Sequence, residues 1–163
     1  MTAIKPAMKS THTDDLITMA YDALEGYEDL QAYHRQHGTP SLLILTQHSP
    51  DIAIETARLL GPEIDGKRVI EIGAGVGFLA IEMARRAASV IAIEVDPAWS
   101  WIFTRSLYAH KPPNLTWIFG TAESVADVIR ADVAVVCTRS GHAAMEEVAA
   151  KMAPRVIFPL GKE

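Results

Sequence analysis

The chain has 163 residues, of which 49% are hydrophobic and 21% charged, the size and balance of a single globular domain. Its formal charge of −5 supplies no general attraction to phosphate backbones, so nucleic acid is a poor default partner. The one cysteine, Cys137, excludes an intrachain disulfide and a cysteine-rich zinc site, and no apolar run has the length of a membrane span. We therefore expect a cytoplasmic protein with no metal and no membrane contact.

The first predicted element is an amphipathic helix over residues 13–36, with apolar residues at helical spacing. Its stripe consists of Leu16, Met19, Ala20, Ala23, Leu24 and Tyr27. An apolar segment at 41–45 follows, and its short length favours a buried strand. We interpret residues 1–45 as an N-terminal helical extension that caps the site of a core formed by residues 46–163.

The core begins with a helix predicted from Pro50 to about Leu60, which Gly61 and Pro62 are expected to end. After Lys67, apolar strands alternate with helix-length amphipathic segments. The predicted strands are 69–72, 90–94, 115–119, 133–137 and 155–159, and the predicted helices are 77–86, 97–110, 122–130 and 141–151. This alternation is typical of βαβ crossovers, so the predicted fold class is α/β, doubly wound around a mainly parallel sheet.

A glycine-rich turn, Gly73–Gly77, joins the first core strand to its helix. Its glycines allow unusual backbone angles and let a ligand lie against the main chain at a helix N-terminus. Glu94 ends the next strand, 17 positions after Gly77, where a carboxylate can accept hydrogen bonds from both hydroxyls of a ribose. A tight turn without a ligand and a solvated strand-end acid are the alternatives, but the two features together predict a nucleotide-like ligand.

Two details separate the candidate ligands. The third glycine of a dinucleotide fingerprint falls on Phe78 here, which makes an NAD-dependent oxidoreductase the lesser alternative. Glu71, two residues before the first glycine, would repel a pyrophosphate but suits an amine or a sulfonium cation. Cationic S-adenosylmethionine matches both details.

Residues 69–77 and 90–97 resemble the first two motifs of class I S-adenosylmethionine-dependent methyltransferases, and the resemblance spans roughly residues 50–160. It implies that S-adenosylmethionine is the cofactor and S-adenosylhomocysteine the product. The cofactor-binding residues it implies are Glu71, Gly73, Ala74, Gly75, Gly77, Glu94, Val95, Thr121, Ala122 and Cys137. The third motif departs from the family, because Thr121 and Glu123 stand where an acidic residue often follows the third strand.

No catalytic residue is assigned. The Asn/Asp-Pro-Pro-aromatic motif of many nitrogen methyltransferases is absent after the fourth strand, so the expected acceptor is a small molecule or a protein. His142 would suit a general base and Arg139 an anion anchor, but we favour a surface-helix position for His142 and a buried strand position for Cys137. Trp99 and Phe103 are expected to pack in the core, and Trp101 to be an exposed contact.

Family members usually continue for two more strands, so the resemblance implies a short form. The apolar segment 155–158 would then be an edge strand, and we expect a homodimer through it. A cofactor-binding or regulatory module without catalysis is the alternative to a methyltransferase, since both would share the same site.

Overall fold

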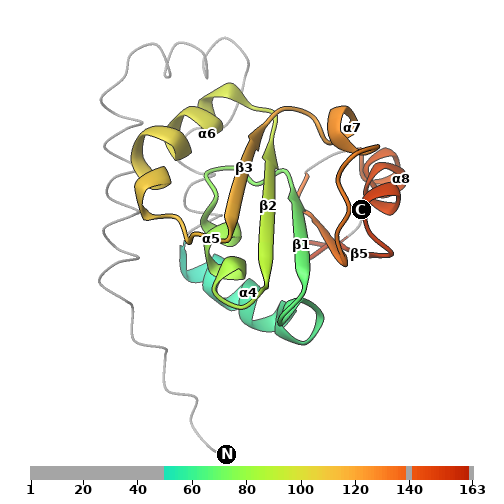
Figure 1. Ribbon diagram of the computed structural model, residues 1–163, viewed down its shortest axis with the longest axis horizontal. Helices are drawn as coiled ribbons and strands as arrows, with labels where there is room; N and C mark the ends of the chain where they lie inside the picture. The colour runs from blue at the N-terminus through green and yellow to red at the C-terminus, as the bar shows by residue number, and fades with distance from the viewer. Residues whose placement is uncertain (1–49, 139–140, 162–163) are drawn as a thin grey trace, which may run out of the picture.

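The computed structural model describes residues 50–138 and 141–161 (Figure 1). The predicted helix at 13–36, the predicted strand at 41–45 and Arg139 lie outside the described residues. The division into an extension and a core therefore stays a prediction.

A sheet of five parallel strands forms the centre of the described core, with helices on both faces (Figure 1). The strands are β1 (Arg68–Ile72), β2 (Ser89–Glu94), β3 (Leu115–Phe119), β4 (Val133–Val136) and β5 (Arg155–Ile157), and their order across the sheet is β3-β2-β1-β4-β5. The order reverses direction at β1, because the chain first builds outward to β3 and then crosses to β4. This arrangement confirms the predicted doubly wound α/β fold.

Alternating side chains bury both faces of the sheet. Val69, Val90 and Val133 belong to one core cluster. Ile70, the residue after Val69, and Ile93, three residues after Val90, belong to the other cluster. On the first face lie α4 (Pro50–Ile64), α5 (Phe78–Ala84) and α6 (Pro97–Ile102). On the second face lie α7 (Ala122–Val125) and α8 (His142–Met152). Burial on both faces explains why these strands read as continuous apolar runs.

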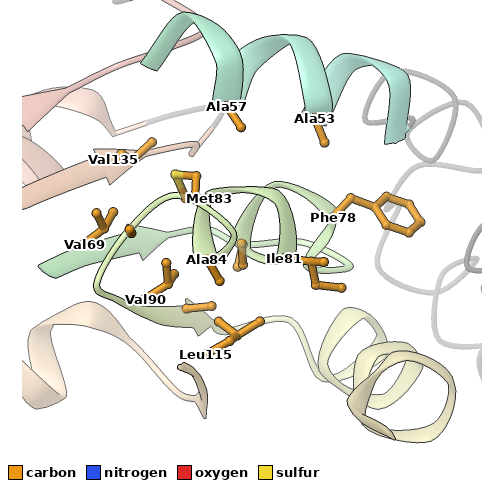
Figure 2. Packing of buried hydrophobic residues seen from close by; sticks show 14 of the residues in the cluster. Ala53, Ala57, Val69, Phe78, Ile81, Met83, Ala84, Val90, Leu115 and Val135 are labelled. Atoms are coloured by element: carbon orange, nitrogen blue, oxygen red, sulfur yellow. The ribbon is translucent and has the colours of Figure 1, made fainter. Parts of the chain in front are cut away.

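Small residues let α4 approach α5 on the first face. Ala53 and Ala57 point from α4 toward the layer that holds Met83 and Phe78 of α5 (Figure 2). Ile64 at the end of α4 is completely buried. The close helix pair covers the strands immediately below the Gly73–Gly77 turn.

The predicted end of α4 is wrong, because the helix continues through Gly61 and Pro62 to Ile64. The ring of Pro62 removes one N–H, but the amide of Asp65 still donates to the Gly61 carbonyl at 2.9 Å. Gly61 lies under the Arg86 side chain, since a Cβ there would lie 2.5 Å from a guanidinium nitrogen of Arg86. That guanidinium crosses Gly61 to pair with Asp65 at 2.8 Å.

The helix predicted at 97–110 covers the right residues but changes geometry along its length. After α6 it widens into a π-helix, η1 (Phe103–Leu107), and closes in a 3-10 turn, η2 (Tyr108–His110). Trp99 and Phe103 are buried, as predicted. Trp101 is instead partly buried against the core, with the Arg105 guanidinium 5.3 Å from its ring centroid, so its predicted exposure is wrong.

The other differences concern the ends of elements. The helix predicted at 122–130 is shorter in the structure, where α7 ends at Val125 and the chain continues in a turn whose Val128 amide donates to the Val125 carbonyl at 3.1 Å. β4 and β5 each end before the predicted residue, although the Cys137 amide still donates to the Ile72 carbonyl at 2.8 Å. β5 pairs with β4 on one side. Pairing of its other side with a second chain stays a prediction.

Among the described helices, none combines the length and the apolar character that a membrane span requires.

Candidate cofactor site

Parallel pairing brings the carboxyl ends of three strands to one edge of the sheet. Ile72, at the end of β1, is in register with Ile93 of β2 and Val136 of β4. Residues that follow these positions therefore meet at the point where the strand order reverses, which is the usual ligand position in open α/β sheets.

The Gly73–Gly77 turn is built by left-handed backbone angles. The φ angles of Gly73, Gly75 and Gly77 are 79°, 59° and 90°, values that side chains other than glycine disfavour. The amides of Gly73 and Ala74 donate to the Ile93 carbonyl at 2.9 and 3.1 Å, which fixes the start of the turn on β2. The chain then enters α5 directly at Phe78.

The three glycines of the turn have different surroundings. A Cβ on Gly77 would lie 2.7 Å from the Phe103 ring, which stacks on Trp117 at a centroid distance of 3.8 Å. A Cβ on Gly73 would lie 3.3 Å from the backbone of Cys137 and from Thr138. A Cβ on Gly75 would meet nothing within 4 Å. Gly77 is required for packing and Gly73 lies in a tight contact, whereas Gly75 borders open space that a ligand can enter.

Glu94 ties the end of β2 to this turn. Its carboxylate is 5% exposed and accepts hydrogen bonds from the Gly75 amide at 2.6 Å and from the Asp96 amide at 2.7 Å, one to each oxygen. Burial raises the pKa of Glu94, while the two amide bonds oppose that rise. Each carboxylate oxygen keeps a second lone pair, so Glu94 can still accept from a ligand.

Glu71 lies beside the carboxyl end of β4 with one oxygen unsatisfied. Its side chain is 1% exposed, and its Oε2 has no hydrogen-bond partner among the described residues. Burial raises the pKa of Glu71 well above its ordinary value, the charge of Glu94 adds to the rise, and the thiol of Cys137 opposes it by donating a hydrogen bond. A buried carboxylate oxygen without a donor is the complement of a cationic N–H group.

Thr138 is a neighbour that the sequence analysis did not single out. Its hydroxyl oxygen is the other buried side-chain atom that lacks a partner in the described part of the chain. Its position one residue after Cys137, at the end of a strand adjacent to β1, is the signal that would have pointed to it. Burial raises the pKa of the Cys137 thiol well above its usual range, so a hydrogen-bond donor to Glu71 is the role that fits Cys137. Cys137 is partly exposed and follows the last residue of β4, so the predicted buried strand position is wrong.

The third strand completes the same edge. The Gly120 amide donates to the Glu94 carbonyl at 2.9 Å, which brings the residues after β3 toward β2. Val95 is 59% exposed there, while Thr121 caps α7 by accepting a bond from the Ser124 amide at 3.3 Å. The side chain of Ala122 is buried in the second core cluster, so its backbone is the part that can face a ligand.

The described residues contain no group of three or more His, Cys, Asp or Glu side chains arranged to hold a metal ion.

No protein-family model matches the sequence. The curated relatives include a Pyrobaculum aerophilum protein named "Probable ribosomal RNA small subunit methyltransferase A", which is 38% identical over 84 residues. That match covers 50% of this chain and 34% of the relative. A Methanosarcina mazei protein of the same name is 63% identical over 30 residues, 18% of this chain and 11% of the relative. The chain thus spans about a third or less of the length of these relatives.

Solved structures share the fold of the core. M. jannaschii TYW2 in complex with AdoMet superimposes with a TM-score of 0.53 at 18% identity, covering 62% of this chain and 48% of that one. An S-adenosylmethionine-dependent methyltransferase from Thiobacillus denitrificans, in complex with S-adenosyl-L-homocysteine, gives a TM-score of 0.51 at 21% identity over 61% and 44%. The described core has the Rossmann-like fold of class I methyltransferases. This shared fold agrees with the predicted resemblance.

The names of the curated relatives run against one prediction. Their printed acceptor is ribosomal RNA, whereas the net charge of this chain made nucleic acid a poor default partner. Charge describes the average surface and does not determine what one site of the fold accepts.

Proposed function

We propose that this methyltransferase core binds S-adenosylmethionine at the carboxyl ends of β1, β2 and β3 and transfers its methyl group to RNA. The observation that carries the cofactor proposal is the unsatisfied Oε2 of Glu71, which lies buried beside the Gly73–Gly77 turn. The ammonium group of the methionine portion supplies the donor and the positive charge that this oxygen lacks.

The rest of the site fits the same ligand. Gly75 leaves open space against the main chain, and the free lone pairs of Glu94 suit the two ribose hydroxyls. Val95, Thr121 and the Ala122 backbone would surround the adenine, and Cys137 would hold Glu71 in place. Once bound, the cofactor supplies an electrophilic methyl group, so the protein is needed mainly to orient the acceptor and exclude water.

A dinucleotide fits this site less well. Phe78, in place of the third glycine of the fingerprint, is buried at the start of α5 and belongs to the core. Its side chain removes the close backbone approach that a pyrophosphate needs. The site therefore favours a cationic nucleoside over NAD.

RNA is the acceptor class that the printed names of the curated relatives support. The segment after β4 lacks the Asn/Asp-Pro-Pro-aromatic motif, which weighs against an exocyclic amine of a base. We therefore place the methyl acceptor on another atom of the RNA.

Calorimetric titration with S-adenosylhomocysteine and with NAD tests the cofactor proposal. We expect S-adenosylhomocysteine to bind more tightly, and equal or tighter binding of NAD would contradict the proposal. Transfer of a radiolabelled methyl group to an in vitro transcript of small-subunit ribosomal RNA, with a protein extract and a small-molecule extract as the comparison acceptors, tests the acceptor. Label in either extract but not in the transcript would exclude RNA.

A further inference from the structure

His142 is the first residue of α8, and one of its ring nitrogens is already in a hydrogen bond. Its Nε2 lies 2.9 Å from the carbonyl oxygen of Thr138. A carbonyl oxygen can only accept a hydrogen bond, so Nε2 carries the proton. In the neutral ring Nδ1 then has a free lone pair and is the basic nitrogen.

A second contact holds the plane of the ring. Phe158, which follows β5, meets the imidazole edge to face at a centroid distance of 5.6 Å and an interplanar angle of 82°. His142 is half-buried, and within residues 50–138 and 141–161 no hydrogen bond reaches its Nδ1. The ring is thus oriented from two sides while Nδ1 stays available, and His142 is the first residue of a mostly exposed helix, as the sequence analysis favoured.

Thr138 connects His142 to the cofactor turn. The backbone nitrogen and Cγ2 of Thr138 would both lie 3.3 Å from a Cβ on Gly73. The hydroxyl oxygen of Thr138 is also one of the two buried side-chain atoms without a described partner, and the other belongs to Glu71. Through the Thr138 carbonyl, His142 therefore contacts the residue that packs against Gly73 at the start of the turn.

We infer that Nδ1 of His142 accepts the proton that the methyl acceptor loses, so that the acceptor atom is a hydroxyl oxygen or a ring N–H nitrogen of the RNA. The inference rests on the proposed function. In this step the acceptor lone pair forms a bond to the methyl carbon, and the carbon–sulfur bond breaks with its electrons moving to sulfur. The proton of the acceptor passes to Nδ1, and the resulting imidazolium returns it to water.

Nitrogen NMR of the histidine rings tests this inference without a known acceptor. Comparison of the wild-type protein with His142→Gln assigns the ring signals. We expect the Nε2–H tautomer, and we expect the signals to shift when S-adenosylhomocysteine is added. An Nδ1–H tautomer, or ring signals that do not respond to saturating S-adenosylhomocysteine, would overturn the inference. Failure of the wild-type protein to bind S-adenosylhomocysteine would instead contradict the proposed function.

Variants test the chemical role. The amide of His142→Gln can still donate to the Thr138 carbonyl but provides no base, so we expect methyl transfer to fall by about 10²–10⁴-fold, the range for losing a general base. Its affinity for S-adenosylhomocysteine should stay within about twofold, because the group acts on the acceptor side. His110→Gln, an exposed histidine on η2, is the matched control and should retain wild-type transfer. Equal transfer rates for His142→Gln and the wild type would overturn the inference.

Discussion

The carboxylate of Glu94 holds the Gly75 amide at 2.6 Å and thereby fastens β2 to the turn that follows β1. The same side chain is the proposed ribose contact, so one residue has a structural role and a binding role. Variants at this edge of the sheet must therefore be measured twice, once for the free energy of unfolding and once for cofactor affinity.

Replacement of Glu94 by Ala removes both acceptor oxygens. We expect the binding free energy of S-adenosylhomocysteine to weaken by about 1–3 kcal/mol, the range for losing charge-assisted hydrogen bonds. Calorimetry measures this change. Glu63→Gln is the control carboxylate, because Glu63 pairs with Arg155 on the surface at 2.9 Å, far from the turn in the chain. Equal affinities of Glu94→Ala and Glu63→Gln would remove Glu94 from the site.

Glu71→Gln should change how stability depends on pH. Because burial raises the pKa of Glu71 above its ordinary value of 4.5, the folded protein keeps this proton where the unfolded chain has lost it. The unfolded state then binds fewer protons, so Glu71 lowers the free energy of unfolding as the pH rises above 4.5. We expect the stability of Glu71→Gln relative to wild type to increase between about pH 4 and about pH 7 in urea unfolding. Parallel pH curves would contradict the burial of an ionisable carboxyl.

Gly75→Ala and Gly77→Ala separate ligand space from packing. Both introduce a side chain at positive φ, which costs about 1–2 kcal/mol. Only Gly77→Ala also collides with the Phe103 ring, so we expect it to lose about 3 kcal/mol or more. Gly75→Ala should fold yet lose about tenfold or more in S-adenosylhomocysteine affinity, about 1.4 kcal/mol, because its methyl group enters the ligand space. The reverse order of stabilities in urea unfolding would contradict these packing assignments.

RNA binding should depend weakly on salt. Five described arginines are paired with carboxylates, and these are Arg58, Arg68, Arg85, Arg86 and Arg155. Paired cations neutralise few phosphates, so we expect log affinity for the ribosomal RNA transcript to fall with log salt concentration at a slope no steeper than about −2. Filter binding at several salt concentrations measures the slope. A much steeper slope would show that pairing with carboxylates does not keep these arginines from contacting phosphates.

Local sequence patterns predicted which edge of the sheet carries the site, because parallel strands bring their carboxyl ends to the same edge. Residues 69–77 showed an apolar strand that runs into glycines, and Glu94 ended the next strand. Parallel pairing of the two strands brings the glycine turn and Glu94 together. Helix ends were harder to predict. Pro62 weakened the local case for α4, but the burial of Ile64 in the core favours continuation of the helix past it. Such contacts come from distant parts of the chain and leave no local pattern.

The sequence by itself determined the fold class, the position of the turn and the two carboxylates beside it, because strand alternation and glycine positions are local properties. Only the tertiary structure decided what these groups contact. The sheet order places β4 next to β1, and this sets Cys137 and Thr138 against Glu71 and the turn. The tertiary structure also orients the His142 ring and engages its Nε2 in a hydrogen bond, since Thr138 and Phe158 contact the ring from different parts of the chain. Hydrogen bonds and ring contacts depend on distance in space, which the order of residues along a chain does not contain.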